Sequence, residues 1–173
     1  MKIALVSDAV YPYHKGGKER RIFEITTRLA EMGHDVHIYC MKWWKEPDTI
    51  RVENNVTLHA ISPLYPLYHG KRRSIVQGIM FGLHCFKLIF EKWDSLEVDH
   101  MPYFPLYSAR IVSWLKGKKM YATWHEVWGR KYWMEYMGGA SGVIAYLIER
   151  CSIFLPDTFI AVSQHTAERL QSV

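Results

Sequence analysis

Cysteine is scarce in this sequence, and its spacing excludes two kinds of stabilising site. The 173 residues include three cysteines, Cys40, Cys85 and Cys151, which lie far apart along the chain. An odd number at these spacings offers neither a disulfide framework nor a Cys-x-x-Cys metal site. We therefore expect buried thiols in a reducing compartment, and a fold that is stabilised by a hydrophobic core.

Long apolar runs are also missing. The most apolar stretch, residues 74–90, is interrupted by Gln77, His84 and Lys87, and it is shorter than the ~20 residues that a membrane-spanning helix needs. The first residues, MKIALVSDAVYP, have too short an apolar run for a signal peptide. We expect a soluble, cytoplasmic protein, and peripheral attachment to the inner face of the membrane stays open.

Familiar nucleotide and zinc motifs are absent as well. The Gly-Gly pair at residues 16–17 fits neither Gly-x-Gly-x-x-Gly nor the P-loop pattern, which argues against an ordinary dinucleotide dehydrogenase or an NTPase. Gly129 stands where a His-Glu-x-x-His motif starting at His125 needs its second histidine. We therefore predict no metal site.

The composition is that of one folded domain with a basic surface. Hydrophobic residues make up 49% of the chain and aromatic residues 14%, so general disorder is excluded. The formal net charge of +5 favours an anionic partner: nucleic acid, a phosphorylated small molecule or an anionic membrane surface. Nucleic acid is the weakest of these, because the basic residues are scattered over several loops and no recognised module is present.

Strands and helices alternate along the sequence. Residues 2–7 are an apolar run of strand length, and from Gly17 apolar residues recur at the spacing of a helix that ends at Gly33. Further strands are predicted at 35–40, 55–62, 95–101, 118–124 and 157–163, and helices at 74–93, 104–116, 138–154 and from Ser163. This order predicts an α/β fold, a Rossmann-like, doubly wound and mostly parallel sheet of about six strands.

Ligands bind such sheets beyond the carboxyl ends of the strands. In the first of these loops, Gly16 and Gly17 let the backbone take positive φ and approach a ligand closely. The free N–H groups at the start of the following helix attract an anion. A phosphate cradle and a simple tight turn are both compatible with the pair.

The loop after the strand at 118–124 carries more chemistry. His125 and Glu126 place a titratable imidazole beside a carboxylate, and Trp124 and Trp128 add flat surfaces of the kind on which sugars stack. A structural loop anchored by tryptophans is the alternative explanation. The helix at 74–93 is hydrophobic on most of its circumference, which fits burial against the sheet or entry into a lipid interface.

Four motifs together resemble the amino-terminal domain of the family 4 glycosyltransferases, which have the two-domain GT-B fold. They are GGKER, LAEMGHDVHIYC, TWHEVWG and IAVSQHTAERL, and the resemblance runs from about residue 2 to the end of the chain. It implies a retaining enzyme that transfers a sugar from a nucleotide sugar and requires no metal or other cofactor.

The resemblance also implies roles for single residues. Gly16 and Gly17 would offer backbone N–H groups to the donor diphosphate, where leaving-group charge develops. His125 and Glu126 would be the catalytic residues. His125 matches the histidine that reaches the donor sugar and contributes to the reacting centre, and Glu126, where Asp is more usual, would orient His125 or meet the acceptor. Further contacts with the acceptor or sugar are assigned to Lys18, Trp124, Trp128 and Ser163. N-capping of a helix would explain the serine equally well.

In such enzymes the amino-terminal domain holds the acceptor, and the carboxyl-terminal domain holds most of the donor. We therefore interpret residues 1–173 as a single amino-terminal domain, inactive alone, with the donor-binding domain absent from this sequence. The acceptor would be a glycan or a lipid-linked sugar, and the apolar helix with the nearby basic residues at 71–73 suggests an amphiphilic one. A non-catalytic α/β module that binds a sugar or a nucleotide is the alternative.

Overall fold

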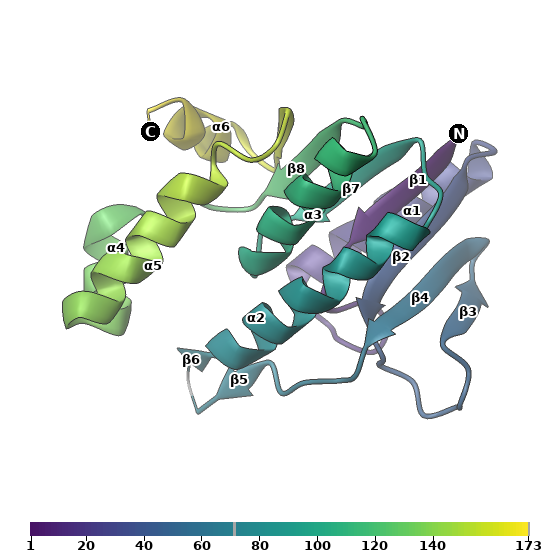
Figure 1. The fold of residues 1–173 in the computed structure, drawn as a ribbon, viewed down its shortest axis with the longest axis horizontal. Coiled ribbons are helices and arrows are strands. Elements are labelled where there is room, and N and C mark those ends of the chain that lie inside the picture. The colour runs from purple at the N-terminus through teal and green to yellow at the C-terminus, as the bar shows by residue number, and fades with distance from the viewer. Residues whose placement is uncertain (71, 173) are drawn as a thin grey trace.

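The computed structural model, which describes residues 1–70 and 72–172, confirms the predicted α/β class. A seven-stranded sheet forms the centre of the domain (Figure 1). Its strands are β1 (Lys2–Val6), β2 (Asp35–Met41), β3 (Ile50–Glu53), β4 (Val56–Ser62), β7 (Ser95–Asp99), β8 (Met120–Trp124) and β9 (Thr158–Ala161). Their order is β3-β4-β2-β1-β7-β8-β9, and every neighbouring pair is parallel except β3 with β4.

Helices cover both faces of this sheet (Figure 1). They are α1 (Gly17–Glu31), α2 (Ile75–His84), a 3-10 helix (Cys85–Phe90), α3 (Phe104–Leu115), α4 (Gly129–Met137), α5 (Gly139–Ser152) and α6 (Gln164–Gln171). Helix α1 lies behind the sheet in this view and α2 and α3 lie in front, whereas α4 and α5 extend beyond the carboxyl end of β8 (Figure 1). A small hairpin, β5 (Tyr68–His69) with β6 (Arg72–Arg73), precedes α2.

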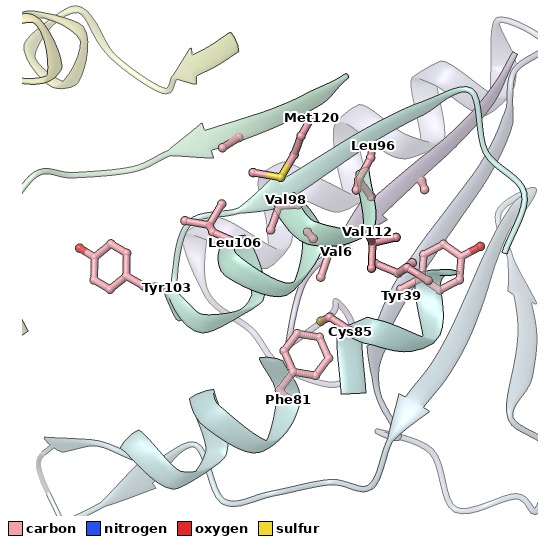
Figure 2. Packing of buried hydrophobic residues seen from close by; sticks show 14 of the residues in the cluster. Val6, Tyr39, Phe81, Cys85, Leu96, Val98, Tyr103, Leu106, Val112 and Met120 are labelled. Carbon is pink, nitrogen blue, oxygen red and sulfur yellow. The ribbon is translucent and has the colours of Figure 1, made fainter. Parts of the chain in front are cut away.

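The larger core lies between the sheet and helices α2 and α3. Val98 and Met120 project from the strands toward Phe81 of α2 and Leu106 of α3, as Figure 2 shows, and all four are fully buried. A Cβ on Gly82 would lie only 2.8 Å from Cβ of Phe104. The absence of a side chain there lets the two helices pack closely.

The six predicted strands correspond to the six parallel strands, within one or two residues at most ends. The predicted cap at Ser74 is confirmed, since its hydroxyl accepts a hydrogen bond from the Gln77 N–H at 3.2 Å. The helix predicted to continue to about residue 93 is wrong, because α2 ends at His84 and the chain tightens into the 3-10 helix. Cys85 and Leu88 eclipse each other at the three-residue period of that helix, and both are fully buried.

The small β5–β6 hairpin was not predicted, and neither were two larger elements, β3 and α4. Strand β3 is an edge strand that turns into β4 through Asn54 and Asn55, whose φ angles are 49° and 60°. Asparagine tolerates this left-handed conformation, so the Asn-Asn pair was the available signal for a hairpin. Helix α4 falls in the aromatic segment that the sequence suggested was a loop.

Cys40 and Cys85 are buried as predicted, whereas Cys151 is exposed. The expectation for Cys151 is therefore wrong, because α5 turns the neighbouring Glu149 and Ser152 inward instead. Among the described residues, no helix combines the length and apolar character required to cross a bilayer.

Candidate functional site

Two aspartates at the carboxyl ends of β1 and β7 share one lysine. Nζ of Lys18 lies 2.7 Å from Oδ1 of Asp8 and 2.7 Å from Oδ2 of Asp99, and it donates to the carbonyl of Met101 at 3.1 Å. Both aspartates are buried, and the Lys18 side chain is 13% exposed. The first turn of α1 is thereby tied to two adjacent strands.

Asp8 also fixes the hairpin and the start of α2. Nη2 of Arg73 forms a short ion pair with Oδ2 of Asp8, and Nε2 of Gln77 donates to the same oxygen at 3.0 Å. The pair of buried carboxylates is therefore matched by two cations, Lys18 and Arg73. Pairing with opposite charges offsets part of the desolvation cost of burying these carboxylates.

His125 extends this network to the surface. Its Nε2 lies 3.0 Å from Oδ1 of Asp99, and 21% of its side chain is exposed. Behind it, the ring of His100 stacks on Trp124 with centroids 5.0 Å apart, and Nδ1 of His100 accepts the backbone N–H of His125 at 3.3 Å. His125 is thus held from two sides with its outer edge open.

The charged states follow from these contacts. Burial acts to raise the pKa of Asp99, but Lys18 and His125 outweigh it and hold that pKa well below its usual range. Burial acts to lower the pKa of Lys18, and the two aspartates reverse the effect and raise it. Burial lowers the pKa of His100 to about 3, so this imidazole is neutral. The network therefore combines a fixed ion pair with an uncharged histidine.

Asp99, His100 and His125 could also be considered as metal ligands, since their donor atoms lie within 4.8 Å of one another. The ammonium of Lys18 already lies 2.7 Å from Asp99, however, and Nδ1 of His100 is occupied by a backbone N–H. A cation there would face a fixed positive charge. This donor set does not favour a metal, and metal-free chemistry stays a prediction.

The glycine pair lies at the start of α1, beside the same network. Gly16 is the N-cap with φ −125°, so the positive φ expected for this position is wrong. A Cβ there would come within 2.3 Å of Oε2 of Glu19, a flexible but buried side chain that folds back over the helix start. Gly17 has no atom within 4 Å of the place where a Cβ would stand, so its backbone is open to approach.

Two predicted sugar contacts are placed differently. Trp124 is fully buried, between His100 and Phe159, so the prediction that it offers a surface to a sugar is wrong. It lies under the site because it is the last residue of β8, a strand with neighbours on both sides, and its side chain packs in the core. Lys18 is engaged by carboxylates, so its contribution is to hold Asp99.

The remaining candidates surround His125. The carboxylate that holds His125 is Asp99, whereas Glu126, the next residue along the chain, has an exposed side chain that lines a neighbouring cavity with Trp128. Ser163 caps α6, because its Oγ accepts the Thr166 N–H at 3.1 Å. Oγ1 of Thr166 in turn donates to the His125 carbonyl at 3.0 Å, so this cap also supports the site.

That cavity has a volume of about 510 Å³ and lies between α2, the loop after β7, α4 and α5. Its walls include Tyr103, Phe104, Trp128, Trp133 and Tyr136, with Ile144 and Ile148 from α5. Among the described residues that line it, only Arg73 and Glu126 carry charged side chains. The polar network around Asp99 and His125 therefore lies next to a cavity lined mainly by aromatic and aliphatic side chains.

Sequence reasoning missed Asp8 and Asp99 as members of the site. Both stand at the ends of predicted strands that lie side by side, because β1 pairs with β7. Carboxyl ends of neighbouring parallel strands meet at one edge of a sheet, so this placement was a usable signal. Lys18 is buried between them because α1 packs against the sheet, and no sequence pattern predicted this position for Lys18.

Comparison with known proteins agrees with this architecture. The sequence model of Glycosyltransferase Family 4 matches residues 15–173. Sucrose-phosphate synthase from Thermosynechococcus elongatus is 16% identical with a TM-score of 0.69, and the match covers 99% of this chain and 44% of that one. A putative UDP-N-acetylglucosamine 2-epimerase from Listeria monocytogenes is 10% identical with a TM-score of 0.54, over 99% and 42% of the two chains.

These two likenesses show the fold alone, and the chain spans less than half the length of either structure. No curated protein sequence matched the chain. The family match covers the glycine pair, the His125 loop and the cap of α6, in agreement with the resemblance seen in the sequence. The chain belongs to glycosyltransferase family 4.

Proposed function

We propose that this chain is the acceptor-side domain of a retaining glycosyltransferase, which transfers a sugar from a nucleotide sugar to a glycan or a lipid-linked acceptor. Family membership supports glycosyl transfer. The observation that carries the assignment is His125, partly exposed and held 3.0 Å from the buried Asp99 at the carboxyl edge of the sheet. Ligands of open α/β sheets bind at this edge.

Asp99 gives His125 a defined orientation. A carboxylate only accepts hydrogen bonds, so the 3.0 Å distance between Oδ1 of Asp99 and Nε2 of His125 favours the tautomer that carries its proton on Nε2. The other ring nitrogen, Nδ1, is then left for a hydroxyl of the sugar. We assign His125 to the donor sugar and the exposed Glu126 to the acceptor.

The start of α1 suits the donor diphosphate. Backbone N–H groups and the helix dipole favour an anion at this end of a helix. Gly17 leaves the approach to those groups open. Preorganised donors at the departing diphosphate would stabilise the charge that develops in the transition state, without a metal.

A donor-binding domain would complete the enzyme. Both compared structures are more than twice as long as the part that this chain matches. We place the nucleotide on that second domain, and we expect the isolated chain to bind acceptor but to show no turnover. A cytoplasmic location with peripheral contact at the inner membrane face is part of the same proposal.

The test is a screen of the full-length protein against UDP-, GDP- and ADP-sugars, with the anomeric configuration of the product read by NMR. Retention of configuration with one donor class is the expected result. Gly17→Val should raise the KM for the donor, because it places a side chain on the open approach. Inversion, or no transfer with any donor, would reject the proposal, and saturable sugar binding without transfer would favour a non-catalytic module.

A further inference from the structure

Four hydrogen-bond donors converge on one buried carboxylate behind the cavity. Glu149 is 1% exposed, and its Oε1 accepts from the Tyr103 hydroxyl at 3.0 Å and from the Trp128 N–H at 2.8 Å. Its Oε2 accepts from the Gly129 N–H at 2.8 Å and from Nε1 of Trp133 at 2.9 Å. These four bonds match the acceptor capacity of a carboxylate, and the carboxylate lies at the start of α4, where the helix dipole favours an anion.

This arrangement makes one wall of the cavity apolar. Tyr103, Trp128 and Trp133 all line the cavity, and the polar groups named above point away from it toward Glu149. Burial and the neighbouring Glu149 raise the pKa of Tyr103 well above its usual value, so its hydroxyl stays a donor. Tyr103 and Trp133 therefore line the cavity with their rings while their polar atoms are bonded to Glu149 behind it, and Trp128 is bonded to Glu149 through its backbone N–H.

The cavity also has a direction. Its two charged groups lie at the sheet end, since Arg73 contacts Asp8 and Glu126 follows His125. The other end lies along α4 and α5, which extend away from the sheet (Figure 1), and Met137 and Ile144 line it there. The charged groups of the cavity thus lie at the end nearest the proposed reacting centre.

The apolar lining continues onto the outer surface. Ile75 of α2 and Ile144 of α5 both line the cavity and are 51% and 58% exposed, so they stand at its edge. Further exposed apolar side chains follow on the same two helices: Val76, Ile79, Val143 and Leu147. A chain longer than the cavity would therefore still meet hydrocarbon as it leaves.

We propose that this cavity binds the hydrocarbon chain of an amphiphilic acceptor, whose hydroxyl-bearing head lies at His125 and Glu126. The inference rests on the proposed function for the identity of the head as the group that receives the sugar. A volume of about 510 Å³ falls within the range of small-molecule sites. Most side chains that line the cavity are apolar or aromatic, so an oligosaccharide that entered it would find few hydrogen-bond partners for its hydroxyls.

Alkyl glucosides with chains of six to ten carbons, below their micellar concentrations, are suitable probes. Titration into the purified chain, followed by tryptophan fluorescence and by calorimetry, gives Kd for each chain length. Each added CH₂ that enters the cavity should tighten binding by about fourfold. Methyl glucoside should bind more weakly than every longer homologue.

A matched pair of variants locates the binding. Ala145 lines the cavity, whereas Ala140 lies exposed on the same helix outside it. Ala145→Phe should weaken decyl glucoside binding at least tenfold, and Ala140→Phe should leave it unchanged. Ser141→Trp fills the cavity from an exposed lining position and serves as the second blocking variant if Ala145→Phe fails to fold.

A Kd that does not change with chain length, or equal binding by wild type and a folded blocking variant, would overturn the proposal. The binding test needs no nucleotide-sugar donor, so its outcome can be judged independently of the transfer assay. Chain-length-dependent binding in a protein that transfers no sugar would support the cavity and reject the function. Transfer by the full-length protein to methyl and decyl glucoside with equal KM would support the function and reject the cavity as an acceptor site.

Discussion

His125 and Asp99 meet because their strands are aligned in register. Asp99 of β7 pairs with Thr123 of β8, which places His125 just beyond the carboxylate, with Nε2 3.0 Å from Oδ1. Asp99→Asn would keep the shape but replace an obligatory acceptor with a group that can also donate. The imidazole would lose its fixed orientation. We expect the kcat of the full-length enzyme to fall at least tenfold with little change in the KM for acceptor.

The control for this change is Asp48→Asn, an exposed side chain in the turn before β3. Its kcat should equal that of wild type. An Asp99→Asn enzyme with unaltered kcat would show that the ion pair has no part in turnover.

Lys18 neutralises the buried carboxylates, so its removal should destabilise the domain. Lys18→Met leaves Asp99 facing Asp8 with only Arg73 as a compensating cation. Breaking a buried ion pair on one side costs about 3–5 kcal/mol. Urea unfolding should show a loss of this order, and Lys15→Met, at an exposed position, should change the free energy of unfolding by less than about 0.5 kcal/mol. A loss below about 1 kcal/mol for Lys18→Met would contradict the burial seen here.

His100 should make the domain sensitive to mild acid. Its folded pKa of about 3 lies below the unfolded value of about 6.5, so the unfolded state binds more protons between these pH values. Stability is therefore fully present above about pH 6.5 and falls as the pH drops toward 3, by up to about 1.4 kcal/mol per pH unit for this one group. Unfolding free energies of wild type and His100→Phe, measured from pH 7 to pH 5, should diverge in slope. Parallel curves would refute the neutral buried state of His100.

Gly142 sets the spacing of α4 and α5. A Cβ at this position would lie 2.7 Å from the backbone oxygen of Trp133 and 3.0 Å from Cα of Met134. Backbone cannot move aside as a flexible side chain can, so Gly142→Ala should destabilise by about 1–3 kcal/mol. Gly17→Ala, where the space is empty, should be neutral or slightly stabilising in the same denaturant measurement. Equal effects of the two variants would argue against close packing of this helix pair.

Much of the fold could be predicted because its signals are local. Short strand-like segments between helical patterns identified the six parallel strands, and Ser74, Gly33 and Gly117 marked helix ends that the structure confirms. Helix α4 was missed because its aromatic residues pack around Glu149, a partner on another helix that periodicity does not report. Tertiary packing likewise converted the end of the helix predicted at 74–93 into a 3-10 turn.

The sequence predicted the more exposed residues of the candidate site but missed its buried aspartates. His125 and Glu126 stood out as titratable neighbours after a strand, and the glycine pair stood out as a helix start. Asp8 and Asp99 gain their role only when two strands distant in sequence become neighbours. For Trp124 the sequence suggested an exposed sugar contact, but its side chain packs into the core at the end of β8.

The most direct test of the proposed function is the sugar-transfer rate of the full-length protein, measured for His125→Ala with whichever nucleotide sugar the wild type uses in the donor screen. His165→Ala, an exposed histidine on α6, is the matched control. We predict that kcat falls by about 10²-fold or more for His125→Ala and stays within twofold of wild type for the control. A His125→Ala enzyme that turns over at the wild-type rate would contradict the assignment of this site.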